Sequence, residues 1–134
     1  MTVEFDAQAI VARVNEAAIN GVFIGRKKVL ANAVDKILSP PKSGRIYKRR
    51  TVSHQASAPG EAPASDKGIL AQSGRTEPAD NGFTGVVKFS TLYAAALEFG
   101  TNRIEPRPYA RPALQEESKG IQETINRLIG EAIK

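Results

Sequence analysis

Apolar side chains recur at helical intervals in the first part of the chain, which predicts one long helix over residues 5–38. The positions that keep this spacing are Ile10, Val14, Ala17, Ala18, Leu30, Val34 and Leu38. Gly21 and Gly25 weaken the middle of the helix, where we expect a bend or a close contact. Pro40 and Pro41 end it, because proline lacks an amide donor and clashes with the preceding turn.

Residues 39–68 show no steady periodicity and are rich in Pro, Ser, Ala and Gly. Loops of more than about 12–15 residues are uncommon in compact domains and are usually functional or disordered. We therefore expect an extended arm or flap that is mobile in the free subunit, with a short strand between Arg45 and Val52.

Alternating apolar residues predict a β-hairpin formed by residues 69–76 and 82–90. The sequence EPADNG between them is typical of a turn. On the second strand, one face would hold Phe83, Gly85, Val87 and Phe89.

A short helix over 91–99 and a long amphipathic helix over 112–133 follow the hairpin. Ser90 or Thr91 can cap the short helix, and Gly100 suits the left-handed position after its end. The connection between the helices is held extended by Pro106, Pro108 and Pro112. The apolar stripe of the last helix comprises Leu114, Ser118, Ile121, Ile125, Leu128 and Ala132, widened by Ile129 and Ile133.

These elements predict a single α+β domain, which suits a length of 134 residues. It would combine a long N-terminal helix (1–38), a long Pro/Gly/Ser-rich arm (39–68), and a last part (69–134) with a small antiparallel β-sheet, a short helix and a C-terminal amphipathic helix. The expected core comprises Phe83, Val87, Phe89, Tyr93, Leu97, Leu114, Ile121 and Ile125.

The residue types present exclude several kinds of site. The chain contains no Cys, which excludes disulfide frameworks, zinc knuckles, iron–sulfur clusters and thiol nucleophiles. His54 is the only histidine, and a Ser–His–acid triad would have to use it from a segment not expected to be rigid. No glycine-rich phosphate-binding motif occurs. We therefore expect neither enzyme activity nor a cofactor or metal.

The beginning of the chain lacks the features of a signal peptide, and no apolar run reaches the roughly 18 residues of a membrane span. We expect a protein that is made in a cytoplasm and has no membrane partner. The net charge of +5 comes mainly from residues 26–60, which hold nine Lys or Arg and one acidic residue, Asp35.

This local excess of positive charge is consistent with a patch that attracts a polyanion or an acidic protein surface, or with a solvated loop. Tyr47 lies within the basic run and could stack on bases, but no helix-turn-helix, RNA-recognition or zinc signature accompanies it. The candidate patch residues are Lys42, Arg45, Lys48, Arg49 and Arg50.

Glu98 lies in an apolar stretch, YAAALEFGT, and a buried carboxylate needs a partner. The nearest cations in sequence are Arg103, Arg107 and Arg111. One interpretation is a salt bridge that locks subunits together, and the other is an exposed glutamate at a helix end.

Three motifs occur in order: HQASAPGEAPASDKGIL at 54–70, YAAALEFGT at 93–101 and RPYARPAL at 107–114. Together they resemble the tailed-phage minor tail or neck (tail-completion) family, typified by the gene-ten product of a Hong Kong lambdoid siphophage. Tyr109 stands where that family more commonly has Phe, and KGIL where it has TGxL. The N-terminal helix is similar in character only.

The resemblance implies a structural virion protein of the neck or tail top, present in the host cytoplasm during assembly. It would form a ring, expected to be a hexamer, around the DNA channel and help to join tail to head. The implied partners are further copies, a tail terminator or tail tube protein, the head–tail connector and, non-specifically, the DNA. The candidate subunit-interface residues are Glu98, Phe99, Gly100, Arg107, Pro108, Tyr109 and Arg111. The alternatives are a tail terminator ring and, in another class, a basic DNA-binding accessory protein.

Overall fold

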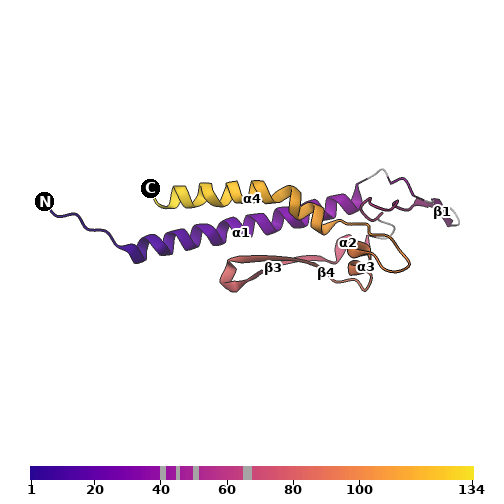
Figure 1. The fold of residues 1–134 in the computed structure, drawn as a ribbon, viewed down its shortest axis with the longest axis horizontal. Helices are drawn as coiled ribbons and strands as arrows, with labels where there is room; N and C mark the ends of the chain where they lie inside the picture. Colours follow the sequence, from indigo (N-terminus) through magenta and orange to yellow (C-terminus); the bar gives the residue numbers. More distant parts are fainter. Residues whose placement is uncertain (40–41, 45, 50–51, 65–67) are drawn as a thin grey trace.

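The computed structural model describes residues 1–39, 42–44, 46–49, 52–64 and 68–134, without the side chains of 47–49 and 52–54. Its elements are α1 (Ala7–Leu38), β1 (Ile46–Arg49), β2 (Val52–Gln55), α2 (Ile69–Gln72), β3 (Gly74–Ala79), the 3-10 turn η1 (Asp80–Gly82), β4 (Thr84–Phe89), α3 (Ala94–Phe99) and α4 (Ala110–Ala132). α4 runs back along α1, and the β3–β4 hairpin lies along the other side of α1 (Figure 1). The predicted α+β class is confirmed.

The long N-terminal helix begins and ends within two residues of its predicted limits. The Asp6 carboxylate caps α1 by accepting bonds from the amides of Gln8 (3.0 Å) and Ala9 (3.2 Å). α1 buries a row of residues spaced by four: Ala17, Gly21, Gly25, Val29, Ala33 and Ile37. Leu38, which we placed on the apolar stripe, is 53% exposed instead.

The glycines of this row let α4 approach closely, which confirms the expected close contact. A Cβ added at Gly21 would lie 2.5 Å from Cγ1 of Ile125, and one added at Gly25 would lie 2.9 Å from Cγ2 of Ile121. Small residues therefore set the distance between the two long helices.

β3 and β4 form the predicted antiparallel hairpin, but its first half differs from the prediction. β3 starts at Gly74, whereas residues 69–72 form the helical turn α2. Glu77, Pro78 and Ala79, which we assigned to the turn, belong to β3. The turn is shorter than predicted and is built around η1. Asp80 and Asn81 adopt positive φ angles there, which these two residue types tolerate better than most.

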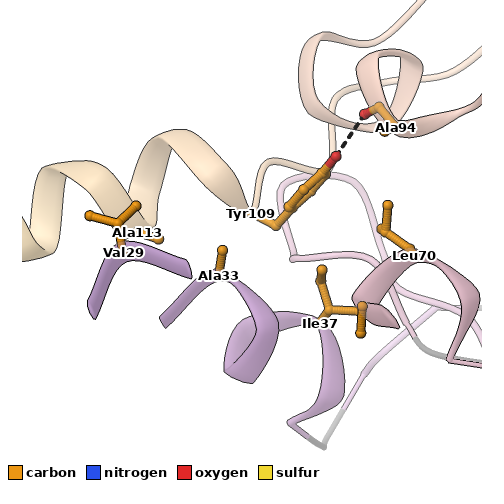
Figure 2. Close-up of a cluster of buried hydrophobic side chains, with 8 residues drawn as sticks. Val29, Ala33, Ile37, Leu70, Ala94, Tyr109 and Ala113 are labelled. Atoms are coloured by element: carbon orange, nitrogen blue, oxygen red, sulfur yellow. Dashed lines mark hydrogen bonds between the residues drawn. The ribbon is translucent and has the colours of Figure 1, made fainter. Parts of the chain in front are cut away.

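The core lies where α1, α2, α3 and the start of α4 meet (Figure 2). Its buried members are Val29, Ala33, Ile37, Leu70, Ala71, Ala94, Tyr109 and Ala113, with Val87, Phe89, Leu97 and Ile121 packed against them. Phe83, Tyr93 and Leu114, which we expected in the core, are 42–52% exposed. At the start of α4, Ala113 rather than Leu114 is buried. The helix itself begins two residues earlier than predicted.

The region expected to be an arm contains a second hairpin, in which β1 pairs antiparallel with β2. This replaces the single short strand that we predicted. Residues after β2 return to the body of the protein, where Ala62 packs against the core. Mobility of the region stays a prediction. Pro40 and Pro41, which we expected to end the first helix, lie outside the described residues.

Candidate functional site

The short helix presents Glu98 from its last turn. α3 begins at Ala94, three residues later than predicted, and neither Ser90 nor Thr91 caps it with a side chain. Gly100 follows with a φ of +77°, which confirms a positive φ, but its ψ of 172° places it outside the expected left-handed helical position. A Cβ at that position would also lie 2.8 Å from Cδ of Pro106, so that only glycine permits this sharp exit.

The Glu98 carboxylate is buried, with 9% of the residue exposed, and it binds the start of α4. Oε2 accepts hydrogen bonds from the amides of Tyr109 (2.8 Å) and Ala110 (3.0 Å). Oε1 accepts one from the amide of Arg111 (2.7 Å). The same carboxylate also lies at the positive end of the helix dipole, where negative charge is favoured.

These three bonds account for the unpaired amide donors of the first turn. A helix leaves its first four N–H groups without intrahelical partners. Glu98 takes those of Tyr109, Ala110 and Arg111, and the fourth residue is Pro112, which has no N–H. Because Tyr109 supplies no capping side chain, the carboxylate of α3 replaces the cap that α4 lacks.

Within the subunit, the cations considered as partners of Glu98 do not pair with it, and a salt bridge between subunits stays a prediction. Across the described residues, Glu98 forms no ion pair with Arg103, Arg107 or Arg111. The Arg111 guanidinium lies over the Phe99 ring instead, 5.2 Å from its centre. The alternative of an exposed glutamate is wrong, since the carboxylate is buried.

Tyr109 fixes the other side of the same contact. Its ring is almost fully buried and meets Phe89 edge to face at 4.9 Å, and its hydroxyl donates to the Ala94 carbonyl at 3.0 Å (Figure 2). Burial, with further contributions from Glu98 and Tyr93, raises the pKa of Tyr109 to about 12. Phenylalanine could not make the hydroxyl bond, so the tyrosine adds a link between α3 and α4.

The three family-like motifs meet around this contact. Arg107 donates from Nε to the Ser57 carbonyl (3.3 Å) and from its amide to the Leu97 carbonyl (2.6 Å). The Gly60 amide donates to the Pro106 carbonyl (3.0 Å). We call this assembly the joint: residues 57–61 of the first motif, 97–100 of the second, and Pro106 together with residues 107–111 of the third.

Glu61 organises the part of the joint that comes from the first motif. Its carboxylate accepts bonds from the amides of Ser43 (3.0 Å) and Ala58 (2.9 Å) and from the Ser43 hydroxyl. These bonds, the one from the hydroxyl foremost, lower the pKa of Glu61 to about 2. The sequence offered no separate signal for this role beyond the SAPGEAP motif itself.

The predicted basic patch is described only in part. Lys42 is half-buried and donates from Nζ to the Lys36 carbonyl (2.8 Å), so it caps the last turn of α1. Desolvation lowers the pKa of Lys42. The side chains of Lys48 and Arg49 are not described, and Arg45 and Arg50 lie outside the described residues.

An open apolar groove of about 690 Å³ lies beside the joint, a size typical of ligand-binding clefts. It is bounded by α1, β4, α3 and the start of α4, and we call it the groove. Its apolar lining includes Val22, Val29, Val87, Phe89, Ala94 and Leu114. Sequence reasoning missed the groove, because its walls come from four separate segments.

Within the described residues, no three His, Asp or Glu side chains are placed to hold a metal ion. Among the same residues, none of the helices is both apolar and long enough to cross a lipid bilayer. Comparison with protein families, with curated proteins and with solved structures gives no match for the chain.

Proposed function

We propose that this chain is a structural protein of the phage neck or tail top, which assembles as a ring around the DNA channel and helps to join tail to head. The observation that carries the proposal is the joint, in which all three family-like motifs meet. Glu98, Tyr109 and Arg107 serve backbone hydrogen bonding and packing there. Because these motif residues hold segments of the subunit together, they support a structural role for the motifs.

Exposed apolar surface supports assembly with other chains. Phe99 and Leu114 line the groove and are 61% and 52% exposed. Monomeric proteins rarely leave large contiguous apolar patches open to water, and such patches commonly mark interaction sites. The groove is therefore our candidate surface for a subunit contact.

Deletion of the gene from a particle-producing genome tests this role. We expect filled heads and tails of normal length that fail to join. Tail tubes of uncontrolled length would indicate the alternative role of a tail terminator ring. Infectious particles at the normal yield would contradict both virion roles.

A basic DNA-binding accessory protein is the alternative from another class, supported by the nine cations of residues 26–60. Gel retardation of duplex DNA at about 150 mM salt tests it, since phosphate contacts weaken steeply as salt rises. Retardation that is lost in a Lys48→Glu, Arg49→Glu double variant would favour this alternative. We expect none with the wild-type subunit.

A further inference from the structure

We propose that residues 1–6 of one copy dock in the groove of a second copy as an extended strand. The inference rests on the proposed ring and names the contact that joins its subunits. It follows from the chemistry of the groove, the pattern of the segment and the reach of the chain.

The groove is apolar at its walls and positive at its rim. Arg26 and Arg111 both line it, and neither takes part in an ion pair among the described residues. Each guanidinium instead lies over an aromatic ring, Arg26 over Phe23 at 4.8 Å and Arg111 over Phe99 at 5.2 Å. An apolar segment that also carries negative charge complements this surface.

Glu98 is the one acidic residue of the lining, and its carboxylate is already engaged by three amides of α4. Its single negative charge offsets only one of the two arginines. The groove keeps a net positive rim that an incoming carboxylate can meet.

Residues 1–6 have the matching pattern. Met1, Val3 and Phe5 alternate with Thr2, Glu4 and Asp6, which is the period of a strand with one apolar face. Val3 and Phe5 are 78% and 82% exposed, and Figure 1 shows the segment extending away from the rest of the molecule. With the apolar face in the groove, Glu4 points towards the rim. Asp6 can stay in place as the cap of α1.

The segment cannot fill the groove of its own subunit. Val22, the groove residue nearest the start of α1, lies 16 residues after Asp6, or about 24 Å along the helix at 1.5 Å per residue. Residues 1–5, even fully extended, span at most about 18 Å. Docking must therefore occur between copies.

The β1–β2 region of a neighbour is a poorer occupant. Ile46 is exposed, but residues 42–50 contain five cations and no acidic group. Like charges at the rim would oppose its entry beside Arg26 and Arg111. Segment 1–6, which has two acidic side chains and no basic one, is the better match.

Such a contact joins one surface of a subunit to a different surface of the next. Head-to-tail contacts of this kind close into rings when the rotation between subunits allows it. The contact thus suits the assembly proposed for this protein.

Because the chain contains no cysteine, cross-linking can test the contact directly. Two full-length variants, Phe5→Cys and Leu114→Cys, are mixed and oxidised, so that a 5–114 disulfide can form only between copies. The control replaces Leu114→Cys by Leu92→Cys, a fully exposed position outside the groove. We expect the 5–114 link at least tenfold more often than the 5–92 link in peptide mass spectra. Equal yields would overturn the proposal.

A second test measures assembly with the double variant Val3→Asp, Phe5→Asp. Sedimentation should show its subunit dissociation constant raised at least tenfold, whereas Leu92→Asp should leave it unchanged. A double variant that assembles as the wild type does would overturn the docking but leave the ring intact. A wild-type protein that stays monomeric, alone and with tail tubes, would overturn both.

Discussion

Oε2 of Glu98 accepts a hydrogen bond from the backbone amide of Tyr109 across 2.8 Å, and this bond links the end of α3 to the start of α4. The amides of Ala110 and Arg111 complete the arrangement. One buried carboxylate thereby takes the place of a local cap and fixes the angle between two helices.

Replacement of Glu98 is expected to destabilise the subunit strongly. Glu98→Ala leaves three amides without their ionised acceptor, which should lower the free energy of unfolding by about 2–4 kcal/mol. Glu98→Gln should cost about 1–2 kcal/mol, because its oxygen still accepts while its NH₂ group faces a donor. Urea unfolding measures both values. The exposed Glu105→Gln serves as a control that should change little. A Glu98→Ala protein as stable as the wild type would contradict the capping role.

Arg111 is expected to matter little for the stability of the free subunit. Its guanidinium is exposed and lies over Phe99, a contact worth about 0.5–1 kcal/mol at such sites. Arg111→Gln should therefore cost no more than about 1 kcal/mol in urea unfolding. A loss as large as that of Glu98→Ala would instead indicate that the carboxylate depends on the guanidinium. The variant should weaken assembly, because Arg111 lines the groove.

Replacement by alanine should have opposite effects on the free energy of unfolding at one glycine of α1 and one glycine of α4. At Gly21 the added methyl would lie 2.5 Å from Cγ1 and 3.2 Å from Cα of Ile125, so α4 would have to move. We expect Gly21→Ala to cost about 1–3 kcal/mol, in spite of its better helix propensity. Thermal unfolding followed by circular dichroism provides the measurement.

The matched control is Gly120→Ala in α4, where nothing lies within 4 Å of the added methyl. It should stabilise the protein by about 0.5–1 kcal/mol. If Gly21→Ala proved stabilising as well, the close contact between α1 and α4 would be refuted.

Acid should loosen the part of the joint that Glu61 holds. Its pKa is lowered to about 2 from the ordinary value of 4.5, so its contribution to stability is present above about pH 4.5 and is lost as the pH falls towards 2. The amide resonances of Ser43 and Ala58, which donate to this carboxylate, should titrate with a midpoint near 2 in NMR spectra. A midpoint near 4.5 would show that these bonds do not form. In Glu61→Gln the transition should disappear.

Much of the fold follows from local patterns in the sequence. Periodicity and the adjacent prolines locate α1 within two residues, and periodicity also locates α4. Gly100 carries its own signal, since a helix that ends before a glycine commonly continues with a positive φ. These features depend on neighbours in the chain and need no knowledge of tertiary contacts.

Other features depend on contacts between residues that are far apart in the sequence, and local patterns do not reveal them. α2 was predicted as a strand, but a helical turn brings the adjacent Leu70 and Ala71 into one core, whereas a strand would point them to opposite faces. The expected partners of Glu98 were cations nearby in sequence, whereas its partners within the subunit are backbone amides. The start of α4 at Tyr109 lacks a capping side chain. That absence was the available sign that the cap comes from another part of the chain.

Native mass spectrometry of the full-length protein can show whether it forms the proposed ring at the top of a phage tail. Alone or mixed with purified tail tubes, the protein should give one closed oligomer, expected to be a hexamer. A persistent monomer that does not bind the tubes, yet retards DNA at about 150 mM salt, would rule out the ring.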